Sequence, residues 1–281
     1  MKILVIGDIF ARPGRMAVKE VLPALRSEMN IDLVIANAEN CHHGKGVSSA
    51  KIAELRGYGV DFFTSGNHIW KVTEIYEHMN QADYPLIRPA NYVDGVPGRG
   101  YAVIEVPPAG GSGESRGSAK SRKVLIINLS GRVYMPGHYS DPFRTAEAVI
   151  ERVKGEGLEL GRGLAAVVVD IHAEASAEKM ALGHFLDGRA SLVYGTHTHV
   201  PTADEQILGG GTAYQSDVGM SGVVNSIIGV DKKEIIENFL TQMPVKHQVA
   251  EGPAVFNALL VEISDDTGLA IRVERIQKYL K

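Results

Sequence analysis

The first fifteen residues, MKILVIGDIFARPGR (1–15), place a short apolar run directly before a glycine and an aspartate. The run KILVIG (2–7) has the length and the β-branched content of a buried strand. Apolar residues then recur at helical spacing over residues 13–28. The stretch therefore predicts a buried strand that ends at Gly7 and Asp8 and is followed by a helix.

The same rhythm of short apolar runs and helical patterns continues along the chain. We expect further strands over 31–37, 60–66, 164–172 and 191–199, and helices over 47–59, 68–79, 141–155 and 176–188. Asp141 is a candidate N-cap, because Pro142 follows it at the first helical position. Strands that alternate with helices predict mostly parallel sheets covered by helices, an α/β class.

The middle of the chain departs from this rhythm. Residues 101–106 and 123–131 are predicted to be neighbouring strands of a hairpin, and PPAGGSGESRGSAKS (107–121) lies between them. Its content of glycine, serine and charge is typical of a flexible surface loop. We interpret it as an insertion in one domain that spans residues 1–281. A helix around 232–240 and strands over 255–264 and 269–277 are expected to complete that domain.

The composition limits the class of protein. A hydrophobic fraction of 44% with 22% charged residues over 281 positions is ordinary for a soluble globular protein. The net charge of −4 argues against a nonspecific coat of nucleic acid, which needs a basic face. The single cysteine, Cys41, allows no intrachain disulfide, and no run reaches the roughly 18 apolar residues of a membrane span. We expect a cytoplasmic protein without a membrane partner.

Unusual polar residues follow five of the predicted strands. They are Gly7-Asp8, Asn37-Ala38-Glu39-Asn40, Ser65-Gly66-Asn67-His68, Asp170-Ile171-His172 and Gly195-Thr196-His197-Thr198-His199. In open α/β sheets, ligands bind beyond the carboxyl ends of the strands. The pattern therefore predicts one site built from several strand ends.

Each of these residues also has an ordinary structural explanation. Asp8 and Asn67 could cap the helices that follow them, since both residue types are common N-caps. His172 could be a hydrogen-bonded structural histidine, and Glu39 could belong to a polar loop.

The pair His197 and His199 is harder to explain in that way. Residues i and i+2 share one face of an extended segment, so both imidazoles can point at one site. Imidazole binds zinc, iron and manganese, and carboxylate oxygens add affinity for harder ions.

Taken together, these motifs resemble those of the calcineurin-like metallophosphoesterases, and most of all their YmdB-like branch. The resemblance extends over nearly the whole chain and is carried by GDIFARPGR, NAEN, SGNHIW, DIHAEA, GTHTHVPTAD and YQSDVGM. It implies a four-layer α/β/β/α sandwich with two metal ions at one edge. It also implies a hydrolase, a phosphodiesterase that acts on 2′,3′-cyclic nucleotides and generic phosphodiesters.

The resemblance also implies a set of metal ligands, with one departure. The wider superfamily begins with Gly-Asp-x-His, and Phe10 stands where that histidine is expected. By similarity to the branch, Asn40 fills the vacancy and Glu39 bridges the two ions. One ion would be held by Asp8, Glu39, Asn40 and His199, and the other by Glu39, Asn67, His172 and His197. Iron and manganese are the expected metals; the alternative is a decayed site without metal, which would be expected to lose more than one ligand.

His68 is the candidate general acid, because it follows a ligand and a histidine has a pKa suited to proton donation. The alternative is a supporting residue without contact to substrate. The implied reaction is attack of a metal-bridging hydroxide on phosphorus, in line with the leaving ribose oxygen. His42, His43, Lys45 and residues 135–138 could shape the entrance, although exposure to solvent is the favoured alternative for His42 and His43. Residues 214–220 receive no ligand role. We assign no substrate-binding residue.

Two other functions remain open from the sequence. A phosphomonoesterase or nucleotidase of the same fold would need a pocket for a dianionic phosphate, and no arginine cluster is tied to the site. A regulatory protein could instead bind a nucleotide or an RNA-linked partner and use its metals for structure. A small phosphodiester is the expected partner, and a homo-oligomer is suggested by base rates for enzymes of this size.

Overall fold

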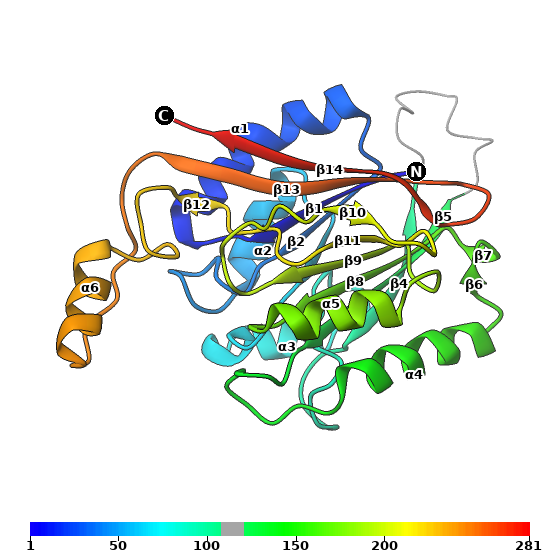
Figure 1. The fold of residues 1–281 in the computed structure, drawn as a ribbon, viewed down its shortest axis with the longest axis horizontal. Helices are drawn as coiled ribbons and strands as arrows, with labels where there is room; N and C mark the ends of the chain where they lie inside the picture. The colour runs from blue at the N-terminus through cyan, green and yellow to red at the C-terminus, as the bar shows by residue number, and fades with distance from the viewer. Residues whose placement is uncertain (108–120) are drawn as a thin grey trace.

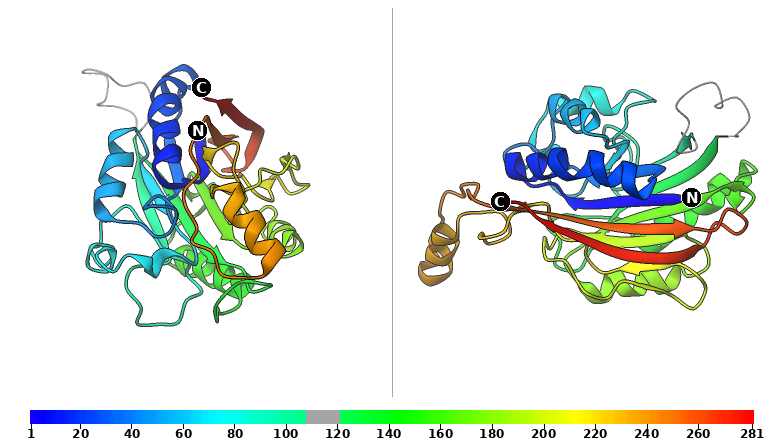
Figure 2. Two further views of the ribbon diagram at one scale, coloured as in Figure 1. Left: turned by 90° about the vertical axis from the view of Figure 1, so that its left-hand side faces the viewer. Right: turned by 90° about the horizontal axis from the view of Figure 1, so that it is seen from above.

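The computed structural model describes residues 1–107 and 121–281. Nearly all of the predicted loop, residues 108–120, thus lies outside the described residues. In the described part the strands form two six-stranded sheets and one two-stranded ribbon, and the long helices other than α6 (Lys232–Thr241) lie on the outer faces of the sheets (Figure 1, Figure 2).

The first sheet has the strand order β12-β13-β1-β2-β3, with β14 paired to β13. Its centre is parallel, because β1 pairs with β2 and β2 with β3 in the same direction. The other side is antiparallel, since β13 runs against β1, β12 and β14. The strands are β1 (Lys2–Asp8), β2 (Leu33–Asn37), β3 (Phe62–Thr64), β12 (Gly222–Val223), β13 (Ala254–Ile263) and β14 (Ala270–Tyr279).

The second sheet has the order β10-β11-β9-β8-β5-β4. Its four central strands are parallel, and β4 and β10 are antiparallel strands at the two edges. Its strands are β4 (Tyr101–Val106), β5 (Arg122–Ser130), β8 (Ala166–His172), β9 (Leu192–Thr196), β10 (Gln206–Ile207) and β11 (Ala213–Gln215), and the ribbon is β6 (Glu159–Leu160) with β7 (Gly163–Leu164). The predicted hairpin of residues 101–106 and 123–131 is confirmed as β4 and β5.

The apolar side chains gather in three layers, which confirms the α/β/β/α sandwich. One layer lies between the sheets and joins Val5 and Ile35 of the first to Val124 and Val168 of the second. The second layer packs the outer face of the first sheet against α1 (Ala11–Met29) and α2 (Ser49–Gly57). The third packs the second sheet against α4 (Pro142–Gly155) and α5 (Ser176–Phe185). Strands buried on both faces explain why their sequences are apolar runs without alternation.

Asp141 is confirmed as a helix cap, and two other local predictions are wrong. The Asp141 side chain accepts hydrogen bonds from the backbone N–H groups of Phe143 and Arg144 at the start of α4. The single helix expected over 68–79 is divided into η1 (Ile69–Lys71) and α3 (Ile75–Met79). Val72 between them is extended, and β-branched residues such as Val72 and Thr73 are weak helix formers.

The strand expected over residues 191–199 stops at Thr196. His197 and His199 follow with φ angles of 101° and 66°, so this segment is a turn. The two imidazoles therefore reach the site without the alternation of an extended strand.

The helix expected around 232–240 is α6 (Lys232–Thr241), which stands away from the sheets in Figure 2. Within the described ranges, every helix is too short or too polar to cross a bilayer.

Candidate metal centre

The two sheets bring the polar strand ends to one edge of the sandwich. Asp8 ends β1, and Glu39 and Asn67 follow β2 and β3 in the first sheet. His172 ends β8, and His197 follows β9 in the second. The contacts below join these five residues with Asn40, His68 and His199, so the structure brings together all eight residues selected from the sequence.

Four lone-pair donors converge on one point. The Nε2 atom of His172 lies 3.0 Å from Oε1 of Glu39 and 3.0 Å from Oδ1 of Asn67. The same atom lies 3.1 Å from Nδ1 of His197. One ring nitrogen carries at most one hydrogen, so these contacts cannot all be hydrogen bonds. A cation is the group that satisfies all four donors, and Glu39, His172 and His197 have the spacing of metal ligands.

The hydrogen bonds behind His172 leave its Nε2 free to bind a metal. Its Nδ1 lies 2.9 Å from the hydroxyl oxygen of Thr196, and that hydroxyl donates to Asp170. Because the Thr196 proton is used in this way, Nδ1 of His172 is the donor to Thr196 and Nε2 carries a lone pair. Burial lowers the pKa of His172 to about 4, which keeps the ring neutral and able to bind a cation.

The other two histidines are oriented in the same manner. Nε2 of His197 lies 3.3 Å from a carboxylate oxygen of Glu174, which leaves Nδ1 to face the cluster. Burial lowers the pKa of His197 to about 3. Nδ1 of His199 donates to the carbonyl oxygen of Ile228 at 2.9 Å, so its Nε2 carries a lone pair and points at Oδ1 of Asp8, 3.8 Å away.

A second group of donors lies beside the first. Oδ1 of Asp8 and Oδ1 of Asn40 are buried and have no hydrogen-bond partner. The Asn40 amide donates from Nδ2 to the carbonyl of Gly44 at 2.9 Å, which fixes its oxygen as the free atom. Burial raises the pKa of Asp8, with His199 opposing that shift. Buried acceptors without partners are costly, and a second cation would satisfy them together with His199.

Phe10 packs against His199, a member of this second group. Its ring meets the His199 ring edge-on, with 5.5 Å between centroids and 73° between planes. The backbones of Gly44 and Gly229 lie close to the same ring. The position of the expected histidine is thus filled by packing, and an oxygen of Asn40 faces the site. Neither Asp8 nor Asn67 caps a helix, because the N-cap residues of α1 and η1 are Phe10 and His68, and neither helix has a side-chain cap.

Gly66 allows the two sheets to approach at this edge. A Cβ atom on Gly66 would lie 2.2 Å from Cδ2 of His172 and 2.5 Å from Oε2 of Glu39. Any other residue would displace one of these two side chains. The glycine before Asn67 is therefore a requirement of the donor cluster.

His68 stands at the border between the donors and an open cavity. Its backbone N–H donates to Oε2 of Glu39 at 2.8 Å, and its ring lines the cavity. Burial lowers the pKa of His68, with Glu39 opposing that shift.

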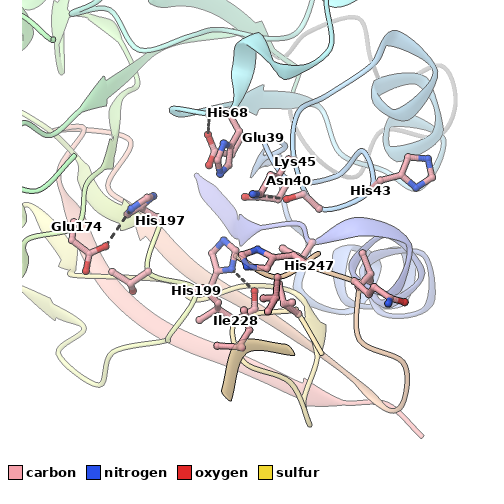
Figure 3. Close-up of a pocket in the computed structure, with 18 residues that line it drawn as sticks. Glu39, Asn40, His43, Lys45, His68, Glu174, His197, His199, Ile228 and His247 are labelled. Carbon is pink, nitrogen blue, oxygen red and sulfur yellow. Dashed lines mark hydrogen bonds and ion pairs between the residues drawn. The ribbon is translucent and has the colours of Figure 1, made fainter. Parts of the chain in front are cut away.

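The cavity has a volume of about 790 Å³ (Figure 3). His43 and Lys45 line it, as suggested from the sequence. Within the described chain, His42 and residues 135–138 are not among the residues that line this cavity.

A buried ion pair that the sequence did not reveal holds the turn between His197 and His199. Oδ2 of Asp217 accepts from the backbone N–H of Thr198 at 3.0 Å and from its hydroxyl at 2.8 Å. Nζ of Lys179 lies 2.8 Å from the same oxygen, and both side chains are 1% exposed. Segment 214–220 thus supports the turn. The only signal in the sequence was the lysine within an otherwise ordinary helix.

Lys179→Met should destabilise the protein by about 3–5 kcal/mol, because it leaves the Asp217 carboxylate buried without its cation. Lys154→Met is the matched control, since Lys154 forms a half-exposed pair with Glu159 and its loss should leave the stability nearly unchanged. Urea denaturation of the three proteins measures both changes. Equal stabilities for the two variants would contradict the supporting role of Lys179.

Comparison with known proteins extends these observations. A family model described as YmdB-like protein matches residues 4–276. The 2′,3′-cyclic-nucleotide 2′-phosphodiesterase of Bacillus subtilis (strain 168) is 40% identical, and the alignment covers 98% of this chain and 96% of that protein. A phosphatase structure from Mycoplasma pneumoniae has a TM-score of 0.85 at 31% identity and covers 100% of this chain and 94% of that one.

A more distant structure shows the fold alone. The calcineurin-like phosphoesterase YfkN of Bacillus subtilis has a TM-score of 0.59 at 13% identity, with 99% of this chain and 90% of that chain covered. The architecture is therefore that of the metallophosphoesterases, as expected from the strand-end motifs.

Proposed function

Because the chain belongs to the YmdB-like protein family, we propose that it is a metal-dependent phosphodiesterase that hydrolyses 2′,3′-cyclic nucleotides. The observation that carries this proposal is the convergence of lone pairs on two adjacent points beside an open cavity. The name of the Bacillus subtilis relative supports the choice of substrate.

Two metal ions fit the donors, and Glu39 is the proposed bridge, because it contacts His172 of the first group and directly precedes Asn40 of the second. The first ion would be held by Glu39, Asn67, His172 and His197, and the second by Asp8, Glu39, Asn40 and His199. When bound, such ions provide Lewis acidity that lowers the pKa of water and neutralises charge on phosphoryl oxygens. Iron and manganese are our proposed metals, because the second group is rich in oxygen donors.

His68 is proposed to donate the proton that the leaving oxygen needs. As water or hydroxide attacks phosphorus, the bond from phosphorus to one ribose oxygen breaks and that oxygen gains negative charge. The imidazolium of His68 would transfer its proton to this oxygen and become neutral. The hydrogen bond from its backbone to Glu39 keeps His68 beside the donors throughout.

Phosphomonoester hydrolysis is the second candidate, because the relative from Mycoplasma pneumoniae is described as a phosphatase. Among the described residues that line the cavity there is no arginine, and Lys45 is the only lysine. A dianionic phosphate would therefore depend on the metals for most of its charge neutralisation, which favours the monoanionic diester.

The proposal is tested by turnover of 2′,3′-cyclic AMP and of 3′-AMP, the monoester that cleavage of the 2′ bond leaves, by manganese-loaded protein. We expect the cyclic diester to be hydrolysed and the monoester product to accumulate. Asp8→Ala should lose most of this activity, because the buried Oδ1 atom is removed from the second group of donors.

A protein that binds two ions but is inert on the cyclic nucleotide and on a generic aryl diester would contradict the proposal. That result would leave the regulatory binding role as the explanation. Release of phosphate from 3′-AMP without cleavage of the diester would instead identify a phosphomonoesterase.

A further inference from the structure

The cavity beside the metal centre has two chemically different sides (Figure 3). Glu39, His68, His197 and His199 form the polar side. Ile228 lies across the cavity from His68 and Glu39. It belongs to a set of five aliphatic residues, which we call the aliphatic wall: Ile228, Val230, Ile235, Val245 and Val249.

The aliphatic wall is an ordered structure that one segment of the chain builds. A β-bridge joins Val230 to Val249, and the N–H of Ala250 donates to the carbonyl of Gly229 at 3.0 Å. Ile235 of α6 and Val230 pack into a small apolar cluster with Phe10. The wall is thereby fixed to the same ring that supports His199.

Ile228 occupies a backbone conformation that disfavours its side chain. Its φ angle is 48°, in the left-handed region that β-branched residues rarely adopt. The backbone of Ile228 orients His199, since its carbonyl accepts the hydrogen bond from Nδ1 of that histidine. Glycine or asparagine would provide that carbonyl with less strain. The isoleucine side chain is 49% exposed at the cavity. Its presence in a strained backbone conformation therefore points to a functional contact of the side chain itself.

An uncharged aliphatic surface cannot bind the phosphate, but it suits the part of a substrate that is joined to the phosphate. With the phosphate at the donors, a nucleoside has to extend into the remaining cavity. About 790 Å³ is within the usual range for such ligand sites. We propose that the aliphatic wall binds the nucleoside of the substrate and that Ile228 is a specificity-determining residue. This inference rests on the proposed function.

The test compares two substrates that share the same reacting ring. They are 2′,3′-cyclic AMP and ethylene phosphate, a five-membered cyclic diester without ribose or base. In Ile228→Gly and Ile228→Asn the backbone carbonyl remains, so His199 keeps its hydrogen bond. We expect kcat/KM for the cyclic nucleotide to fall about tenfold, the usual effect of losing apolar contact in a pocket. Turnover of ethylene phosphate should stay unchanged.

Val224→Gly is the matched control. Val224 is 46% exposed in the same segment but does not line the cavity, so both substrates should be turned over as by wild type. Metal content measured by mass spectrometry should equal that of wild type in all three variants, because no donor is altered.

The outcomes separate the two proposals. If the Ile228 variants turned over the cyclic nucleotide as fast as wild type does, the inference alone would be overturned. An equal loss on both substrates would also overturn it, since the metal centre and not nucleoside binding would be affected. A wild-type enzyme that cleaves ethylene phosphate but not 2′,3′-cyclic AMP would overturn the proposed function and the inference together.

Discussion

Glu39→Gln should abolish metal binding and lower phosphodiesterase activity by a factor on the order of 10³ or more. Glu39 is 1% exposed, and Oε1 lies 3.0 Å from Nε2 of His172. The substitution removes the negative charge of the carboxylate that we propose as the bridging ligand. The new amide can also donate hydrogen bonds to the lone pairs of His172 and Asn67, which would occupy the position of the metal.

The same variant should also differ from wild type in the stability of its metal-free form. Burial raises the pKa of Glu39, which shows that the charged carboxylate is disfavoured when no cation is bound. The metal-free Glu39→Gln protein should therefore be at least as stable as metal-free wild type. Metal content and thermal unfolding, both measured with and without added manganese, check these two expectations.

Glu174→Gln is the matched control. Glu174 is 50% exposed, and a glutamine there can still accept the hydrogen bond from Nε2 of His197. Metal content should stay at the level of wild type. Retention of both metals by Glu39→Gln would contradict its role as the bridge, whatever the effect on activity.

His68→Ala should lower kcat by about 10²–10⁴-fold and leave the metal content unchanged. The change removes the proposed proton donor, but the backbone N–H that holds Oε2 of Glu39 remains. Steady-state kinetics on 2′,3′-cyclic AMP and metal analysis of the same samples measure the two effects separately. A variant that loses its metals would instead show that His68 supports the donors.

The dependence of kcat on pH offers an independent check. A general acid must be protonated, so kcat should fall as the pH rises through the pKa of His68. Burial lowers that pKa from its ordinary value of 6.5. The decline in kcat should therefore begin below neutrality in wild type and be absent in His68→Ala. His247→Ala, which removes another imidazole from the cavity lining, should keep the wild-type profile.

The elements and most of the candidate ligands were predictable because their signals are local. A buried strand such as β1 is an apolar run, and the polar residue that ends it, Asp8, stands out against that run. Glu39, Asn67 and His172 were found in the same way. The role of Asn40 came from resemblance to a known family, and its unpartnered oxygen in the structure supports that role.

Other features depended on groups that are distant in the chain. The sequence predicted that His197 and His199 share a strand face, whereas a turn places them, and Asp217 and Lys179 hold that turn. The expectation failed because extended spacing is a local rule, while the N–H of His197 donates to Asp8, 189 residues away. The hydrogen bonds that orient each imidazole were likewise not visible in the sequence.

By itself, the sequence determined which apolar runs are buried, most of the segments that form strands or helices, and which polar side chains follow those strands. These properties arise from the hydrophobic effect and from backbone preferences that act over a few neighbouring residues. The tertiary structure alone decided which ring nitrogens face the donors and that a lysine is buried beneath the turn. It also placed a strained isoleucine at the cavity. Each of these depends on the short-range directions of hydrogen bonds and contacts, which exist only once the two sheets have packed together.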